Sequence, residues 1–483
     1  MYLLLIAALI LIAIVFAAKI SSKMNVPLIV IALSIGIIFG SDITGLIYFD
    51  DEILTQKIAD IALVFILFAG GFGTKNYNLR PVIKPTLLLA TLGVLITALI
   101  TAIPFAYFTG WAILSSLLLC AIISSTDAAA VFSILSNYSI NKNIRSITEI
   151  ESAANDPMAI ISTSLILQIT LGENFDHISA ILLFFWQLTG GIIIGIAAGL
   201  AGSYLFKKIK DLDIGYLYLL LLGVILLSYS FASVIGASGM LSAFFAGYVM
   251  GNSKLPYKTG IASFTEILSF ISSAGLFILL GLLVFPKNFP EVWVLGLLLF
   301  ILLTFIGRPA AVFICTMFTK LTYKEKLFLS WSGFRGAVPI VLATYPFAAG
   351  IDENHVFFNI VFFAVALSMI IQGTTIGKIA RKFRLISKHR KKSAQTMELV
   401  TVHETDYELI EIYIDPDIYT GECMVYEMSL PFGTTITMLN RNNFIVAPSG
   451  KTTVIPGDIL SVLVKREKVK YVTEIILGKF SKK

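Results

Sequence analysis

The sequence predicts an all-α, multi-spanning membrane domain of about thirteen helices, followed by a small α+β domain. Of the 483 residues, 57% are hydrophobic and only 14% are charged, and the mean hydropathy is +0.88. A soluble globular domain is far more polar than this. Apolar runs long enough to cross about 30 Å of hydrocarbon recur along the chain. They lie near 2–18, 25–40, 59–73, 85–107, 111–136, 147–171, 178–206, 214–232, 234–251, 262–285, 291–317, 326–349 and 354–377.

The composition changes after the last apolar run. Eight Lys or Arg residues lie between Lys378 and Lys392. They mark a basic linker over 379–395, which is either a solvated stop signal or a lipid-binding patch. From 396 to 483, shorter runs such as "ELIEIYI" and "ILSVLVK" are separated by turns that contain Pro and Gly. The chain is therefore expected to consist of a membrane domain over 1–378, the linker, and an α+β domain over 396–483.

Basic residues in the connections predict the orientation in the membrane. Alternate connections hold fifteen Lys or Arg residues, whereas the intervening connections hold only Lys57 and Lys287. Short connections rich in Lys and Arg stay on the cytoplasmic side. The N-terminus is therefore expected outside together with Asp352 and Glu353, and Lys324 and the C-terminal domain are expected in the cytoplasm.

Five ionisable residues fall well inside the predicted spans. A charge at the bilayer centre costs roughly 2.5–3.5 kcal/mol, so each such residue is a candidate for a functional site. They are Asp127, Glu151, Asp156, Arg308 and Arg335.

The densest polar group inside a span is "ESAANDP". Glu151 and Asn155 are four residues apart, and so are Ser152 and Asp156, so the two pairs form neighbouring stripes on one side of a helix. Pro157 weakens the helical turn beside them. Several oxygen ligands in a flexible cage suit a hard cation. The alternative interpretation is a buried polar network that holds the helices together.

Two other spans carry interruptions beside a charge. In "AIISSTDAAAVFSIL" the polar run ends with Thr126 and Asp127. In "FLSWSGFRGAVPIVLA" the charged Arg335 is flanked by Gly333, Gly336 and Pro339. Interrupted helices at matching places in two halves are typical of inverted-repeat transporters with a site near the midplane. The two spans are seven apart in the series, an odd offset, so the equivalent helices run in opposite directions.

The sequence holds no sign of an enzyme or a resident cofactor. It has no phosphate-binding Gly-rich loop with Lys, and no nucleophile next to a base. The cysteines, Cys120, Cys315 and Cys423, do not have the spacing of metal ligands or of a disulfide framework. No enzyme activity, cofactor or nucleic-acid partner is therefore expected.

The stretches "SSTDAAAVFSIL", "ESAANDPMA", "GRPAAVF" and "FRGAVPIVLATYPFAAG" resemble the monovalent cation:proton antiporters, and among them the NhaP-like, cell-volume-regulation type of potassium/proton antiporter. The resemblance implies a secondary active antiporter that exchanges K⁺ or Na⁺ for H⁺ across a prokaryotic cytoplasmic membrane. It also implies two broken crossing helices, a homodimer and an elevator-like movement of the ion-binding helices.

The resemblance also implies roles for individual residues. Asp156, next to Asn155, would be the carboxylate that holds either a monovalent cation or a proton. Having Asn155 in place of a second Asp resembles the members that exchange one cation for one proton. The other matching positions are Glu151, Ser152, Thr126 and Asp127 around the cation, with Arg335 as the arginine of the opposing broken helix. Arg308, which lies inside the eleventh predicted span, is expected to be a second compensating charge.

The end of the chain carries a second resemblance. "GTTITMLNRNNFIVAPSGKTTVIPGDILSVLV" is similar to the TrkA C-terminal type of regulatory domain, and Gly457 and Asp458 match its usual Gly-Asp turn. The resemblance implies a cytoplasmic domain at which a nucleotide-type ligand regulates transport.

Two other classes of protein stay open at this point. Similar regulatory domains occur on potassium channels, so a ligand-gated cation channel is one alternative, although a TVGYG-type filter is missing from the sequence. A solute-binding receptor without transport is another. The choice between K⁺ and Na⁺ also stays open, because oxygen ligands suit both ions.

Overall fold

The computed structural model of the chain describes residues 28–40, 42–49, 51–76, 82–128, 139–140, 142–172, 177–209, 212–284, 286–352, 355–387, 394–397, 406–416, 421–441 and 444–480, with residues 8, 12, 13, 15, 16, 131, 132, 135 and 419. The predicted span near 2–18 lies largely outside these residues. The chain divides into two compact units, residues 1–136 with 140–386 and residues 137–139 with 387–483. The predicted boundaries of the membrane domain, linker and tail stay predictions.

The larger unit is helical, as predicted. Its described helices are α2 (Leu28–Phe39), α3 (Glu52–Gly73), α5 (Ile83–Ala90), α6 (Leu92–Thr109), α7 (Ile113–Ile122), α9 (Lys142–Thr170), α10 (His177–Lys208), α11 (Ile214–Val234), α12 (Gly239–Asn252), α13 (Lys258–Leu282), α14 (Phe289–Leu302), α15 (Arg308–Cys315), α16 (Tyr323–Trp331), α17 (Ala337–Leu342), α18 (Tyr345–Ala348) and α19 (Val356–Lys382). A π-helical turn, η3 (Leu303–Gly307), joins α14 to α15.

Within the described part of the chain, seven helices are long and apolar enough to cross a membrane. They are α3, α6, α10, α11, α13, the continuous run from α14 to α15, and α19. Each predicted span after the first contains at least part of a described helix or a series of shorter ones. The multi-spanning fold is therefore confirmed, and the count of thirteen stays a prediction.

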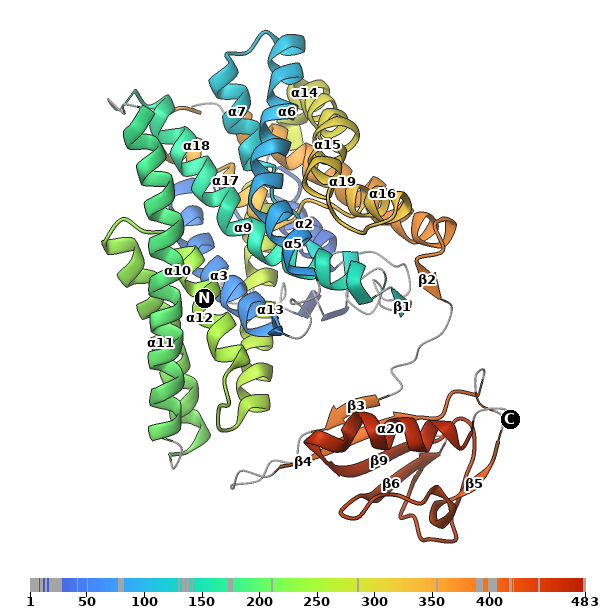
Figure 1. The fold of residues 1–483 in the computed structure, drawn as a ribbon. Helices are drawn as coiled ribbons and strands as arrows, with labels where there is room; N and C mark the ends of the chain where they lie inside the picture. The colour runs from blue at the N-terminus through green and yellow to red at the C-terminus, as the bar shows by residue number, and fades with distance from the viewer. Residues whose placement is uncertain are drawn as a thin grey trace. The chain divides into compact units, whose positions relative to one another are not determined.

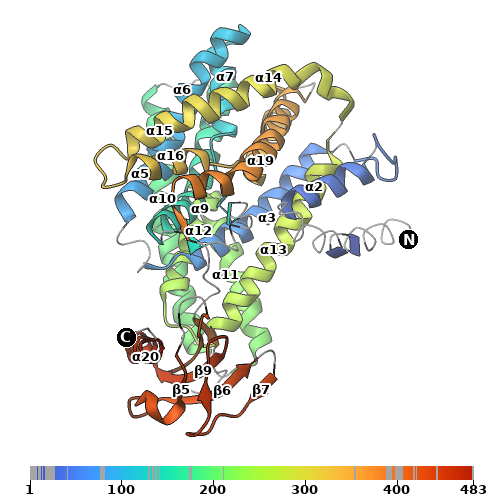
Figure 2. The ribbon, with the colours of Figure 1, turned by 90° about the vertical axis from the view of Figure 1, so that its right-hand side faces the viewer.

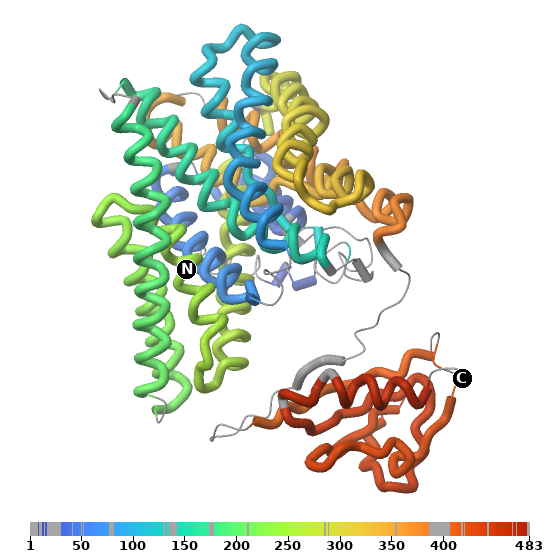
Figure 3. Tube along the Cα trace, in the orientation of Figure 1, coloured from blue at the N-terminus to red at the C-terminus, as the bar shows by residue number. Residues whose placement is uncertain are grey.

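The helices of this unit form two bundles (Figures 1 and 2). Helices α2, α3 and α10 to α13 pack mainly on one another, and α5 to α7, α9 and α14 to α19 form the second bundle. The chain reverses between α10 and α11, which lie side by side (Figure 3). Helix α9 also contacts α3, α10 and α12, so it lies where the two bundles meet.

Glycines allow α3 and α12 to touch through their backbones. A Cβ atom added to Gly247 or to Gly251 would lie 2.2 Å from a carbonyl oxygen of α3, and one added to Gly71 would lie 2.0 Å from the Phe244 carbonyl oxygen. Small residues permit such close approach between membrane helices, where van der Waals packing holds the helices together. The 14-residue helix α12 is therefore fixed against the longer α3.

The smaller unit has the α+β character that the sequence predicts. Its sheet is antiparallel with the order β3-β4-β9-β6-β7, and β5 pairs separately with β8. The described strands are β3 (Ala394–Met397), β4 (Tyr407–Tyr413), β5 (Cys423–Met424), β6 (Thr435–Arg441), β7 (Phe444–Val446), β8 (Thr453–Val454) and β9 (Ile459–Lys465), and the helix is α20 (Val469–Gly478). Two further two-residue strands are β1 (Ser139–Ile140) and β2 (Ile386–Ser387).

The turn before β9 is stabilised by an ion pair. Asp458 is buried, and its carboxylate accepts two hydrogen bonds from the Arg441 guanidinium, at 2.8 and 2.7 Å, and one from the Ile455 amide at 2.9 Å. Gly457 has a φ angle of +99°, a region that favours glycine. The Gly-Asp turn that the sequence singled out therefore has a structural role.

Candidate functional site

Two unwound segments meet in the middle of the second bundle. The first, residues 123–127, follows the end of α7, and the second, 332–336, lies between α16 and α17. The Asp127 amide donates a hydrogen bond of 2.8 Å to the Phe334 carbonyl, which joins the two segments. Non-helical backbone at membrane depth is tolerated only where it is enclosed by protein or lines a polar cavity. Both predicted helix breaks are therefore present, and they contact each other.

Arg335 binds the end of the opposing broken helix. Its side chain is buried, and Nη1 donates to the carbonyl oxygens of Ser124 at 2.6 Å and Ser125 at 2.7 Å. These carbonyls follow the C-terminal end of α7, where unpaired carbonyl groups carry partial negative charge. A permanent positive charge is thus fixed at a helix end.

Asp127 has the reciprocal position on the other segment. A Cβ atom added to Gly336 would lie 2.4 Å from Asp127 Oδ2, so the carboxylate packs directly on the backbone that leads into α17. Helix α17 begins at the next residue, Ala337, and the N-terminal end of a helix carries partial positive charge. The C-terminal end of α7 therefore faces the positive charge of Arg335, and the N-terminal end of α17 faces the negative charge of Asp127.

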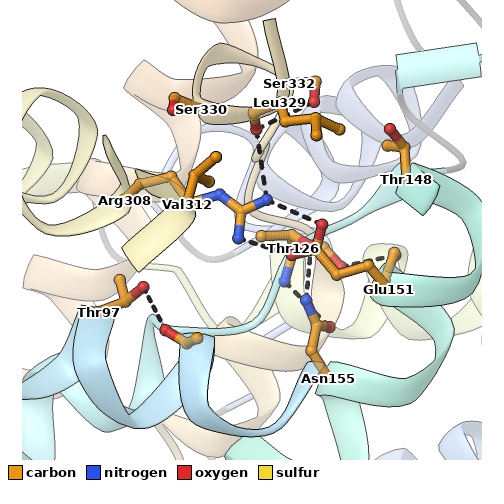
Figure 4. Close-up of polar contacts among 12 residues, drawn as sticks. Thr97, Thr126, Thr148, Glu151, Asn155, Arg308, Val312, Leu329, Ser330 and Ser332 are labelled. Atoms are coloured by element: carbon orange, nitrogen blue, oxygen red, sulfur yellow. Dashed lines mark hydrogen bonds and ion pairs between the residues drawn. The ribbon is translucent and has the colours of Figure 1, made fainter. Parts of the chain in front are cut away.

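Helix α9 holds the first unwound segment through polar side chains (Figure 4). The Asn155 amide donates to Thr126 Oγ1 at 2.7 Å and accepts from the Thr126 amide at 3.4 Å. Ser152 Oγ donates to the Thr126 carbonyl at 2.8 Å and accepts from the Ala128 amide at 2.9 Å. Three of the predicted site residues, Thr126, Ser152 and Asn155, are therefore brought together and are buried.

Asp156 follows Asn155 on α9 and interacts electrostatically with Asp127. Both acids are half-buried, whereas residues 122–126 are all buried. Helix α9 continues without a break through Pro157, so the weakened turn beside the acids does not open the helix. Two carboxylates therefore lie close enough to interact, beside backbone carbonyl groups that are not part of a regular helix.

Glu151 has a different environment from Asp156. Its carboxylate forms an ion pair with Arg308, with Oε1 at 2.6 Å from Nη1 and Oε2 at 3.1 Å from Nη2 (Figure 4). Both side chains are at most 5% exposed. Arg308 also donates to the Leu329 carbonyl at 3.3 Å, which links α15 to α16. The expected role of Glu151 as an additional cation ligand stays untested, and this two-point contact favours a role as the partner of Arg308.

The sequence interpretation missed one acid inside the membrane unit. Asp60 lies nine residues along α3 and accepts a hydrogen bond of 2.8 Å from the Tyr345 hydroxyl. The predicted span near 59–73 left Asp60 at a helix end. The sequence signal for the longer helix is Asp51, because Asp is a favoured residue at the N-cap of a helix. In the structure its side chain accepts a hydrogen bond of 2.8 Å from the Leu54 amide and caps α3.

The fold and site define a class of protein: a multi-spanning secondary transporter with two crossing broken helices and acids at the crossing. The family described as "Sodium/hydrogen exchanger, transmembrane" matches residues 7–382, and this chain belongs to it. Membership supports antiport rather than a ligand-gated channel, and transport rather than an enzyme reaction.

Individual relatives are similar over most of the chain. The K⁺/H⁺ antiporter NhaP2 of Shewanella sp. strain ANA-3 is 33% identical over 468 residues, which are 95% of this chain and 81% of the relative. The K⁺/H⁺ antiporter NhaP of Alkalimonas amylolytica is 36% identical over 411 residues, 85% of this chain and 71% of the relative. The sodium proton antiporter MjNhaP1 from Methanocaldococcus jannaschii at pH 8 has a TM-score of 0.68 at 26% identity and covers 79% of this chain and 99% of its own.

Proposed function

We propose that this chain exchanges one monovalent cation for one proton and that Asp156 is the group for which the two ions compete. The observation that carries the proposal is the position of Asp156 on α9, directly after Asn155, whose side chain is hydrogen-bonded to Thr126 at the crossing of the two unwound segments. A charged carboxylate is costly in a membrane interior unless another charge neutralises it. A proton and a cation can each do so, and one shared carboxylate then couples the two fluxes in opposite directions.

We assign the neighbouring residues to two groups. Thr126, Asp127, Ser152 and Asn155 offer oxygen atoms next to Asp156 and hold the unwound segment in place. Arg335, Arg308 and Glu151 provide fixed charges, because each already has a buried partner. A guanidinium group stays protonated and would repel a cation at contact distance. The predicted homodimer and elevator-like movement stay predictions.

The test is cation-induced proton movement in proteoliposomes with an internal pH dye. Addition of K⁺ or Na⁺ to one side is expected to drive protons to that side, and Li⁺ provides a third ion for selectivity. K⁺ is proposed as the favoured ion because the relatives that are 33% and 36% identical to this chain are named K⁺/H⁺ antiporters. Cation flux that moves no protons, at rates above those of a carrier, would support the channel alternative.

We also propose that the chain lies in the cytoplasmic membrane of a prokaryotic cell, with its N-terminus outside and its C-terminus inside. The support is the asymmetry of basic residues across the connections. Two exposed residues report on the two faces: Glu291 at the start of α14 and Lys324 near the start of α16. Asp352 is less suitable, since it is buried and accepts from the Val356 and Phe357 amides.

Single cysteines at these two positions are expected to react differently with an impermeant thiol reagent. In a variant without Cys120, Cys315 and Cys423, the cysteine at position 291 should be labelled in intact cells, and that at 324 only after permeabilisation. Labelling of position 324 in intact cells would overturn the orientation.

For the C-terminal domain we propose regulation by a small nucleotide-type ligand, as its similarity to TrkA C-terminal domains implies. Removal of residues 395–483 is expected to leave exchange active and to change its dependence on pH or on cytoplasmic ligands. The reason is that all five predicted intramembrane charges precede residue 336. Flux in proteoliposomes measures the effect. A truncated protein that is correctly inserted but inactive at every pH would show that the domain is needed for transport itself.

A further inference from the structure

A polar cavity lies where the two bundles meet. Its volume is about 170 Å³, and residues of α3, α9, α10, α11, α12 and α18 contribute to its lining. We refer to it as the Asp60 pocket. Asp60 is the one acidic residue among the described residues that line it, and that set includes neither Lys, Arg nor His. The other polar groups of the lining belong to Ser164, Gln187, Tyr229, Ser233, Ser238 and Tyr345.

The oxygen atoms of the pocket suit a cation better than an anion. One oxygen of the Asp60 carboxylate accepts from the Tyr345 hydroxyl at 2.8 Å. The Ser233 hydroxyl donates to the Tyr229 carbonyl at 2.9 Å, so its own oxygen can still accept or bind a cation. The volume exceeds that of a single water, whose share of liquid volume is about 30 Å³. The pocket therefore has room for a monovalent cation that keeps part of its hydration shell.

The pocket lies about one helical turn along α9 from Asp156, the proposed transport carboxylate. Ile160, which lines the pocket, is four residues after Asp156 on α9, a rise of about 6 Å along the helix. Ile160 and Ile161 are 7% and 1% exposed. Two buried isoleucines therefore form the wall of the pocket nearest in sequence to Asp156. With the proposed orientation, the pocket lies in the outer half of the membrane, because Asp60 is on the first half of α3.

We propose that the Asp60 pocket is a second binding site for the transported cation, through which the ion passes between the outer face and Asp156. The inference rests on the proposed antiport function. Asp60 supplies the negative charge, and the surrounding hydroxyl and amide groups replace part of the hydration shell. Ile160 and Ile161 separate the two sites while the helices are in the arrangement described.

A purely structural explanation makes a different prediction. The hydrogen bond from Tyr345 to Asp60 also joins α3 to α18, and so it links one bundle to the other. If this were its whole role, loss of either partner would have the same effect. A cation site instead depends on the carboxylate, so Asp60→Asn and Tyr345→Phe should differ.

The experiment compares the apparent KM for K⁺ and Na⁺ at each face of oriented proteoliposomes, with the full chain. Asp60→Asn is expected to raise the outer-face KM about tenfold, the factor that corresponds to about 1.4 kcal/mol, with no such rise at the inner face. Tyr345→Phe keeps the carboxylate and removes one hydroxyl of the lining, so its rise in the outer-face KM is expected to be much smaller than that of Asp60→Asn. Glu291→Gln, which removes an exposed acid predicted to lie on the same face, is the matched control and should resemble the unmutated protein.

Equal KM values for Asp60→Asn and the unmutated protein, an equal rise at both faces, or the same rise in Tyr345→Phe would overturn the proposal. A second measurement does not require transport: crystals soaked in Rb⁺ should show an anomalous peak beside Asp60, absent in Asp60→Asn. If the unmutated protein exchanged no ion, the antiport function would be wrong, and this peak would still decide whether the pocket binds a cation. Its absence at saturating Rb⁺ would contradict the site.

Discussion

Asp156→Asn is expected to abolish exchange of K⁺ or Na⁺ for protons at every pH, while the protein still folds and inserts. The substitution keeps the size of the side chain and removes the group that can lose a proton. Without it, no titratable group remains at position 156 for the two ions to share. Asp127 is the acid that remains, and its carboxylate packs against Gly336 at the start of α17. Cation-induced proton movement in proteoliposomes measures the effect, with size-exclusion chromatography as the check on folding.

Glu151→Gln is the matched control for this experiment. It is also an acid-to-amide change on α9, but its carboxylate is paired with Arg308 at 2.6 Å. Breaking a buried pair at one partner typically costs about 3–5 kcal/mol, because the remaining charge is left without compensation. Glu151→Gln should therefore lower thermal stability or shift the pH dependence while exchange continues. Exchange that survives in Asp156→Asn and disappears in Glu151→Gln would mean that the cation and the proton compete for Glu151 and not for Asp156.

Arg335→Ala is expected to be nearly inactive. The guanidinium donates to the carbonyls of Ser124 and Ser125 at 2.6 and 2.7 Å, and both belong to the unwound segment that leads to Asp127. An unsatisfied buried polar group costs roughly 1–3 kcal/mol, so the loss of both contacts destabilises the crossing itself. The initial rate of exchange in proteoliposomes is the measurement.

Arg335→Lys separates the charge from the geometry. An ammonium group keeps the positive charge beside the end of α7 but lacks the planar fork of the guanidinium. Partial exchange with a shifted pH profile is therefore expected. Full activity of Arg335→Ala would show that neither the charge nor the contacts at this position are needed.

The broken helices could be predicted from the sequence because their causes are local. The polar run through Thr126 and Asp127 and the Gly and Pro residues around Arg335 interrupt the apolar pattern directly. The sequence places Ser152 and Asn155 on neighbouring stripes of one side of α9. In agreement with this, both side chains contact Thr126. The class of fold and the family followed from the same residues.

The partners of the charged residues could not be predicted in this way. Glu151 and Arg308 are 157 positions apart, and helical periodicity gives the face of α9 on which Glu151 lies but not the helix that packs against it. The same holds for Arg335 and the carbonyls of the opposing segment, and for Tyr345 and Asp60. Such contacts depend on how separate helices pack, which no local pattern encodes.

Proton release from purified protein tests the central claim, competition of a cation and a proton for Asp156, most directly. In a weakly buffered detergent solution, addition of K⁺ or Na⁺ to the unmutated protein should release up to about one proton for each cation bound, because the two ions neutralise the same carboxylate. Choline chloride should release none, and Asp156→Asn should show no release with any salt. Cation binding without proton release by the unmutated protein, or equal release by Asp156→Asn, would contradict the account.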